Sequence, residues 1–374
     1  MICETALIHV WMIKELIERT AGACNAIQPK AAIGCDGNLL DAAFSATGTC
    51  LVSRSSERRN RFTLARVGNM SDKNLDDAYE LVDKAYQLSN EGKIREAISV
   101  YDQLLSRFPR SALYNQRGIL YSECGEYRKA IIDLTDGIGL CENDPDLYVN
   151  RGNAYLRSCA FEAAIDDYDR ALSLAPDEKH ALNGKAQALA DLARIAEAIC
   201  VWERAIELYP TFVNAHFNLG LLFYEEKRLE EALRCLNLAH HLEPQDAVVL
   251  RLRGDVYLAL RNYLQALRDY ELAVDSAPSD AHGYSRLAWV LSTCPDAQLR
   301  NGTLALGHAT KACVLTDWKN PMCLESLAAA CAEIGDFREA IRHQHEAIEN
   351  YTSSLRQTAV KHLQVLQQSK ALRD

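Results

Sequence analysis

The sequence predicts an all-α fold, a solenoid of antiparallel helix pairs, and three observations support this prediction. A glycine or alanine returns about every 34 residues, an alanine follows twelve residues after nearly every one, and apolar residues recur at offsets of 3, 4 and 7. Such offsets place side chains on one face of a helix, so each unit is expected to contain two helices. The returning small residues are Ala85, Gly118, Gly152, Ala186, Gly220, Gly254, Ala288 and Ala328.

The first helix of each unit contains the returning small residue. Glycine inside a helix costs about 1 kcal/mol relative to alanine, so its repeated use needs a compensating gain. We expect that gain to be close approach of the two helix backbones where they cross, with aromatic side chains filling the space beside the crossing.

The second helix of each unit is expected to end at a proline, because proline cannot continue a helix. The second unit departs from this rule, since Glu142 stands at the proline position and Pro145 follows three residues later. Prolines occupy the matching position in five units, as Pro109, Pro176, Pro210, Pro244 and Pro278.

The periodic pattern divides the chain into three parts, which are residues 1–69, an array at 70–354 and a last amphipathic helix at 355–374. Residues 1–69 lack sustained periodicity and could be a tail, a weak targeting segment or the product of an upstream start. The last helix is expected to cap the array, because solenoid ends expose an apolar face. The eight expected units span 78–110, 111–144, 145–178, 179–212, 213–246, 247–280, 281–320 and 321–354.

The phased pattern of glycine or alanine, aromatic residue, alanine and proline resembles the tetratricopeptide repeat. The segment NAHFNLGLLFYEEKRLEEALRCLNLAHHLEP, at 214–244, is the most similar stretch, and the resemblance covers about residues 78–354. It implies a right-handed superhelix in which the first helices line the concave face and make most of the partner contacts.

The seventh unit is longer than the others, because Ala305 comes seventeen residues after Ala288. The five extra residues fall in the turn-forming stretch CPDAQLRNG, at 294–302. The segments TCPD, KAC, WKNP and LAAA of this region resemble a variant that closes the repeat arrays of bacterial tetratricopeptide repeat proteins. We therefore expect a longer loop at the rim, with Trp318 packed on the next helix and Pro321 at its start.

Polar side chains on the predicted concave face are the candidate partner-binding residues. A carboxamide both donates to and accepts from a peptide backbone, so a row of asparagines suits the capture of an extended peptide. The alternative is that asparagine occupies some of these positions for reasons of the fold. The candidates are Asn115, Asn150, Asn153, Asn183, Asn214, Asn218, Arg251, Asp255 and Arg286.

Motifs for catalysis, metals or cofactors are lacking. No complete Lys/Asn/Arg clamp for a carboxylate terminus occurs in any three units, and no phosphate loop, GxSxG or HExxH motif is present. Glu339, His343 and Glu346 share one face, which is expected to be solvated, and Asp166–Asp167 is expected to be surface charge. We therefore predict no enzyme, no metal site and no cofactor.

Composition limits the cellular role. Residues 1–69 have a net charge of +2 and residues 70–374 one of −12, so the array lacks the basic surface that nucleic acid requires. The thirteen cysteines include no CxxC pair and are expected to be reduced and mostly buried, as in the cytoplasm. No apolar run reaches the roughly 20 residues that span a bilayer.

The sequence thus predicts a non-catalytic scaffold that binds a protein or peptide in a concave groove. A second hypothesis is a regulatory or substrate-recruiting subunit of an enzyme encoded elsewhere, such as a glycosyltransferase or kinase. An exported assembly factor is a third, if residues 1–69 are a signal.

Overall fold

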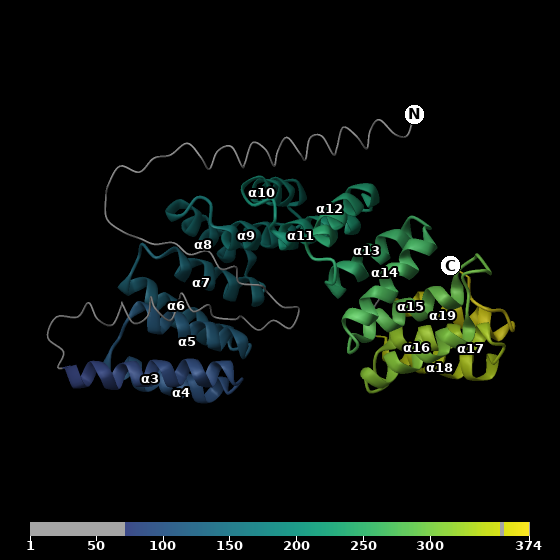
Figure 1. The fold of residues 1–374 in the computed structure, drawn as a ribbon, viewed down its shortest axis with the longest axis horizontal. Coiled ribbons are helices and arrows are strands. Elements are labelled where there is room, and N and C mark those ends of the chain that lie inside the picture. The colour runs from purple at the N-terminus through teal and green to yellow at the C-terminus, as the bar shows by residue number, and fades with distance from the viewer. Residues whose placement is uncertain (1–71, 352–354, 374) are drawn as a thin grey trace. The chain divides into compact units, whose positions relative to one another are not determined.

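The computed structural model describes residues 72–351 and 355–373, and every regular element in these ranges is an α-helix, which confirms the predicted all-α fold (Figure 1). The predictions made for residues 1–69 lie outside the described residues. The first helices of the units are α3 (Asp72–Asn90), α5 (Ser111–Glu123), α7 (Pro145–Arg157), α9 (Lys179–Asp191), α11 (Val213–Glu225), α13 (Ala247–Ala259), α15 (Ala281–Thr293) and α17 (Pro321–Glu333). The second helices are α4 (Ile94–Arg107), α6 (Tyr127–Leu140), α8 (Phe161–Leu174), α10 (Ile195–Leu208), α12 (Leu229–Leu242), α14 (Tyr263–Ser276), α16 (Gly302–Leu315) and α18 (Phe337–Asn350), and α19 (Leu355–Gln367) follows them.

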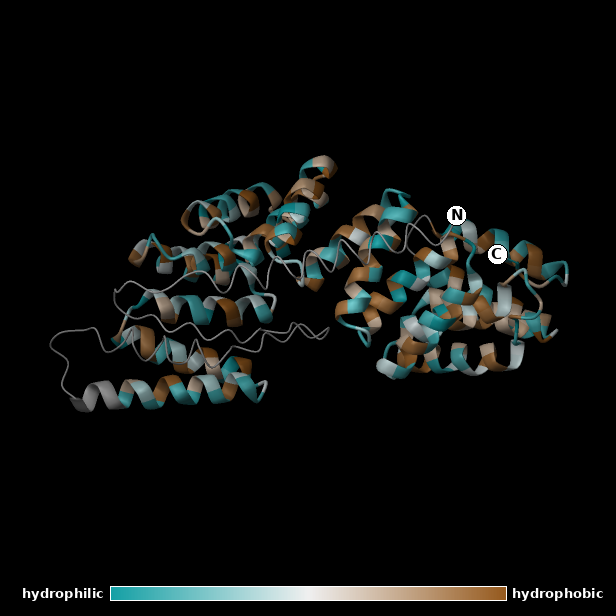
Figure 2. Ribbon diagram, turned by 45° about the horizontal axis from the view of Figure 1, so that its top comes forward, coloured by the Kyte–Doolittle hydropathy of each residue, from teal (hydrophilic) through white to brown (hydrophobic). Residues whose placement is uncertain are grey.

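Each first helix packs against the second helix of its own unit, and each second helix packs against the first helix of the unit that follows or, for α18, against α19. Figure 2 shows apolar and polar residues alternating along the helices, as expected where each helix buries one face. The buried side chains form successive clusters along the chain rather than one core. Such an array is stabilised mainly by contacts between nearest neighbours. Among the described helices, none is long and apolar enough to cross a bilayer.

The turn inside most units passes through a left-handed backbone conformation seven residues after the returning small residue. Three units have glycine there, the residue that adopts positive φ without strain. Four others have residues with a Cβ atom in the same conformation, which costs about 1–2 kcal/mol each. These positions are Gly92, Gly125 and Gly335 (φ 74°, 74° and 88°) and Cys159, Ala193, Lys227 and Arg261 (φ 60°, 57°, 60° and 57°).

The expectation that these glycines let two helix backbones approach each other is wrong. The glycines of the first helices instead make room for a side chain of the second helix. A Cβ atom built on Gly254 would lie 2.6 Å from Tyr270 Cε1, and one on Gly220 would lie 2.9 Å from Leu236 Cγ. Tyr270 and Leu236 stand at the same position of the second helix and are fully buried. The large side chain of the second helix therefore fills the space that the glycine leaves.

The loop of the seventh unit spans residues 294–301 and is tied to the eighth unit. Arg300 Nε donates to Glu333 Oε1 at 2.8 Å, and Arg300 Nη1 donates to the Cys294 carbonyl at 2.8 Å. Pro321 is the first residue of α17, as expected. Trp318 follows a turn with left-handed φ angles at Asp317 and Trp318, and its ring stacks instead on that of His343 in α18, with 6.1 Å between the ring centres.

The helix α19 covers the last pair through buried apolar residues and a polar cluster. Gln344 takes the position that is aromatic in most units, and its Nε2 donates at 2.9 Å to both Glu325 Oε1 and the Ala359 carbonyl of α19. His362 and Tyr351 also bond to Glu325. Although burial acts in the opposite direction, these hydrogen bonds lower the pKa of the Glu325 carboxyl.

Candidate partner-binding face

The nine predicted binding residues all lie on first helices, namely α5, α7, α9, α11, α13 and α15. We call the surface of these six helices the first-helix face. Eight of the nine side chains form a hydrogen bond or an ion pair with a neighbouring side chain. Asn214, half-buried on α11, forms neither among the described residues.

Asn115 and Asn150 join the first helices of units two and three. Asn150 Nδ2 donates to Asn115 Oδ1 at 2.9 Å, and both side chains are half-buried. This single bond uses one oxygen and one amide hydrogen. Within the described residues, Asn150 Oδ1 and Asn115 Nδ2 have no hydrogen-bond partner, so each remains available to a ligand.

Asn183 and Asn218 repeat this arrangement two units further on. Asn218 Nδ2 donates to Asn183 Oδ1 at 2.9 Å, and Trp202 Nε1 donates to the same oxygen at 3.0 Å. Two donors orient the Asn183 carboxamide and occupy its oxygen. The free acceptor of this pair is therefore Asn218 Oδ1.

Asn153 and Asp255 each follow directly after the returning glycine of their unit, and each accepts a hydrogen bond from a buried tyrosine. The hydroxyl of Tyr168 donates to Asn153 Oδ1 at 2.7 Å, and that of Tyr270 donates to Asp255 Oδ1 at 2.6 Å. Both tyrosines come from the second helix of the same unit and are fully buried. The exposed Asn153 and the buried Asp255 thus satisfy a buried hydroxyl from the first-helix face.

The two arginines of the predicted set are paired with aspartates. Arg251 Nε lies 3.4 Å from Asp280 Oδ2, and Arg286 Nε lies 3.1 Å from Asp255 Oδ1. Tyr224 lies near this second pair, and burial together with the Asp255 carboxylate raises the pKa of its hydroxyl. The C-terminal end of the first-helix face therefore contains charges that the protein itself compensates.

A recurring arginine–aspartate pair was missed in the sequence. Arg253 donates to Asp269 through Nε and Nη2, both at 2.7 Å, and its Nη1 reaches Asn237 of the preceding unit at 3.2 Å. Arg117 with Asp133 and Arg151 with Asp167 repeat the pair. The signal was an arginine directly before the glycine and an aspartate sixteen residues later.

Two predictions about surface charge are wrong. Asp166 is exposed, but Asp167 is buried, because Arg151 pairs with it between the two helices of unit three. His343 is also buried rather than solvated, because the Trp318 ring covers it, and its Nδ1 lies 3.0 Å from Glu346 Oε2. Among the described residues, no group of three or more His, Cys, Asp or Glu side chains has an arrangement that could hold a metal ion.

The cysteines are less uniformly buried than expected. Cys313, Cys323 and Cys331 are buried, and burial raises the pKa of the Cys331 thiol to about 11. Three other thiols are exposed, those of Cys124, Cys159 and Cys200.

Comparison with known families and proteins finds tetratricopeptide repeats in this chain. Family models described as "Tetratricopeptide repeat" match residues 81–111 and 145–178, and one described as "TPR repeat" matches 186–227. The chain is 31% identical to a peroxisomal targeting signal receptor of Eremothecium gossypii, over 36% of this chain and 24% of that protein. It is 24% identical to the BBSome complex member BBS4 of Bos taurus, over 74% of this chain and 46% of that protein.

A solved structure, the APC/C hetero-tetramer Cut9-Hcn1, has the same fold. It is 16% identical to this chain, with a TM-score of 0.54 over 82% of this chain and 59% of that one. The chain spans between a quarter and a half of the length of the two curated relatives.

Proposed function

Because this chain is a tetratricopeptide repeat protein, we propose that it is a non-catalytic scaffold that binds a protein or peptide partner. The site is the first-helix face, in the concave groove expected of stacked helix pairs. The relatives described above include a targeting-signal receptor and a member of a protein complex, and their names support a role in protein interaction.

The two asparagine pairs are the observation that carries this proposal. Each pair holds its carboxamides in a fixed orientation through a 2.9 Å bond, so little rotamer entropy is lost when a ligand binds. Asn150 Oδ1 and Asn218 Oδ1 are then free acceptors on helices two units apart. An extended peptide that runs along the first-helix face would donate its backbone N–H groups to both.

The charge of the array limits the partner to a protein or peptide. Residues 70–374 have a net charge of −12, which opposes binding to nucleic acid. Exposed thiols at Cys124, Cys159 and Cys200 fit a reducing compartment, and we therefore place the scaffold in the cytoplasm.

A random peptide library displayed on phage and panned against the full chain tests the proposal. The affinity of the best peptide would then be measured for the double variant Asn150→Ala/Asn218→Ala. We expect a loss of about tenfold, because two hydrogen bonds contribute about 0.5–1.5 kcal/mol each.

The control is Glu207→Ala, an exposed residue of the second helix α10, which should leave the affinity unchanged. Circular dichroism would show that both variants keep their helices. Equal affinity for the wild type and the double variant would contradict the assignment of this face.

A further inference from the structure

The first-helix face is open in units two to six and becomes covered toward the C-terminal end of the array. The residue five positions after the returning small residue lies on this face, one helical turn beyond the position of Asn153 and Asp255. It is exposed in units two to six, as Glu123, Arg157, Asp191, Glu225 and Ala259. At the same position Thr293 of unit seven is 0% exposed, and the side chain of Glu333 of unit eight is only 15% exposed. The chain therefore covers its own first helices here, and one cover is the segment at residues 355–373, which we call the C-terminal segment.

The C-terminal segment contacts the first helices of both units. His362 Nδ1 lies 3.0 Å from Glu325 Oε1 of α17, and the centre of the His362 ring lies 5.6 Å from that of the Trp289 ring of α15. Arg373 Nη1 donates to the Ser292 carbonyl near the end of α15, at 3.3 Å. Trp289 directly follows the returning small residue of unit seven, so this contact is on the first-helix face. A helix that covered only the last pair would contact α17 and α18, whereas this segment reaches one unit further back.

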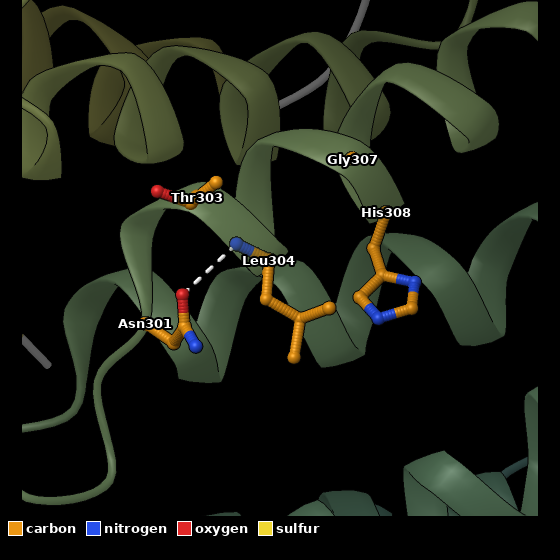
Figure 3. A pocket seen from close by; sticks show the side chains of 5 residues that line it. All are labelled: Asn301, Thr303, Leu304, Gly307 and His308. Carbon is orange, nitrogen blue, oxygen red and sulfur yellow. Dashed lines mark hydrogen bonds between the residues drawn. The ribbon is translucent and has the colours of Figure 1, made fainter.

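Glu333, at the end of α17, receives the last residues of the C-terminal segment. Its Oε2 lies 2.8 Å from Arg373 Nη1, and its Oε1 accepts from Arg300 Nε at 2.8 Å. Arg300 belongs to the long loop of unit seven, and the next residue, Asn301, anchors the end of that loop. Figure 3 shows the Asn301 side chain accepting from the backbone N–H of Leu304 in α16, at 3.0 Å. Because Arg300 occupies one carboxylate oxygen of Glu333, the other is oriented toward Arg373.

The contacts of the C-terminal segment with the first helices are polar and partly open to water. They come from His362 and Arg373, whose side chains are 25% and 40% exposed. Ion pairs with this exposure contribute little to stability. The buried side chains of the segment are few, namely Ala359, Leu363, Leu366 and Leu372. The C-terminal segment can therefore leave the first helices while the array stays folded, as terminal elements with few buried contacts do.

We propose that the C-terminal segment is an internal ligand of the first-helix face, and that it closes this face at units seven and eight until a partner displaces it. The segment contains four arginine or lysine residues and no acidic one, whereas residues 70–374 as a whole have a net charge of −12. It is thus a basic peptide bound to an acidic array.

The chemistry of the competing partner follows from the groups that the C-terminal segment satisfies. Glu325 and Glu333 lie about 12 Å apart along α17, and each contacts a basic side chain of the segment. A partner that replaces the segment is therefore a peptide with two basic side chains at a similar separation. This partner rests on the proposed function, whereas the occupation of the face by the chain itself does not.

A fluorescent peptide of residues 355–373, added to the full chain and followed by anisotropy, tests the proposal. In the double variant His362→Glu/Arg373→Glu, the introduced carboxylates face Glu325 and Glu333, so the chain's own segment is repelled while both glutamates remain. We expect the peptide to bind this variant about tenfold more tightly than the wild-type chain, where it must displace the resident segment. A peptide that itself contains both substitutions should bind the variant about tenfold more weakly than the wild-type peptide does, because like charges then meet.

The control is Arg356→Glu/Lys361→Glu, at two exposed residues of α19, which should bind the peptide as weakly as the wild-type chain does. Circular dichroism would show that all variants keep their helices. No binding to the double variant, equal binding to the double variant and the wild type, or tighter binding to the control as well would overturn the proposal. Because no partner enters these measurements, they are independent of the phage selection, whose failure would contradict only the proposed function.

Discussion

Arg253 and Asp269 form a two-bond ion pair that joins the two helices of unit six in a buried position. The side chains are 10% and 4% exposed, and the two N–O distances are both 2.7 Å. Because Arg253 also contacts Asn237 of the preceding unit, one guanidinium links three helices. The pair therefore stabilises both a unit and its junction with the neighbouring unit.

Replacing Arg253 by methionine should lower the free energy of unfolding by about 3–5 kcal/mol, because Asp269 would remain buried without its counterion. Urea denaturation followed by circular dichroism measures this change. Arg194→Met is the control, since Arg194 pairs with Glu197 on the exposed surface and should matter by at most about 1 kcal/mol. If both variants lose a similar free energy of unfolding, the buried pair stabilises the fold no more than the exposed pair does.

Two glycines in helices should respond to alanine in opposite directions. Gly254→Ala places a Cβ atom 2.6 Å from Tyr270 Cε1, and this ring cannot move freely because its hydroxyl is bonded to Asp255. We expect a loss of about 1–3 kcal/mol. Gly307→Ala meets nothing and should raise stability by up to about 1 kcal/mol. Thermal unfolding in dilute solution compares them, and a stabilised Gly254→Ala variant would contradict the packing described here.

The left-handed turn positions offer a stabilising substitution. Arg261 has φ 57° and an exposed side chain, so Arg261→Gly should raise the free energy of unfolding by about 1 kcal/mol through relief of strain. Gly335→Ala, at the matching position of unit eight with φ 88°, should lower it by a similar amount. Differential scanning calorimetry would detect both shifts, and a drop in stability for Arg261→Gly would be incompatible with this explanation.

His216 should make stability depend on pH. It is 3% exposed, its Nε2 lies 2.9 Å from the Pro210 carbonyl, and burial lowers the pKa of its imidazole. Since the unfolded chain binds a proton first, the free energy of unfolding should fall as pH drops below the ordinary value of about 6.5. His216→Gln keeps a donor for the carbonyl but does not titrate, so its urea midpoint should fall less between pH 7 and pH 5. Parallel losses in the two proteins would exclude His216 as the cause.

The periodic residues made the fold predictable because each unit repeats the same packing problem. Gly254 and Tyr270 occupy positions that recur about every 34 residues, so phase alone places them on the two helices of one unit, but it did not predict that the tyrosine ring fills the space at the glycine. The end of the array has no such repetition. Gln344 departs from the aromatic pattern because its amide bonds to the carbonyl of Ala359 in α19, a contact that only the assembled cap creates.

The candidate site was predictable in position but not in bonding. Phase places Asn115 and Asn150 on first helices, as the structure has them. Their mutual hydrogen bond depends on the spacing between neighbouring first helices, which the pattern of one unit does not contain. His343 shows the same limit, because its burial under Trp318 follows from a turn between units rather than from its own helix face.

The central claim is that a partner binds along the first-helix face, and hydrogen exchange of the full chain with and without a selected peptide tests it most directly. We expect slower amide exchange in α7, α9 and α11 when the peptide is bound, and unchanged exchange in α8, α10 and α12. Protection confined to the second helices, or spread equally over both sets, would contradict the claim.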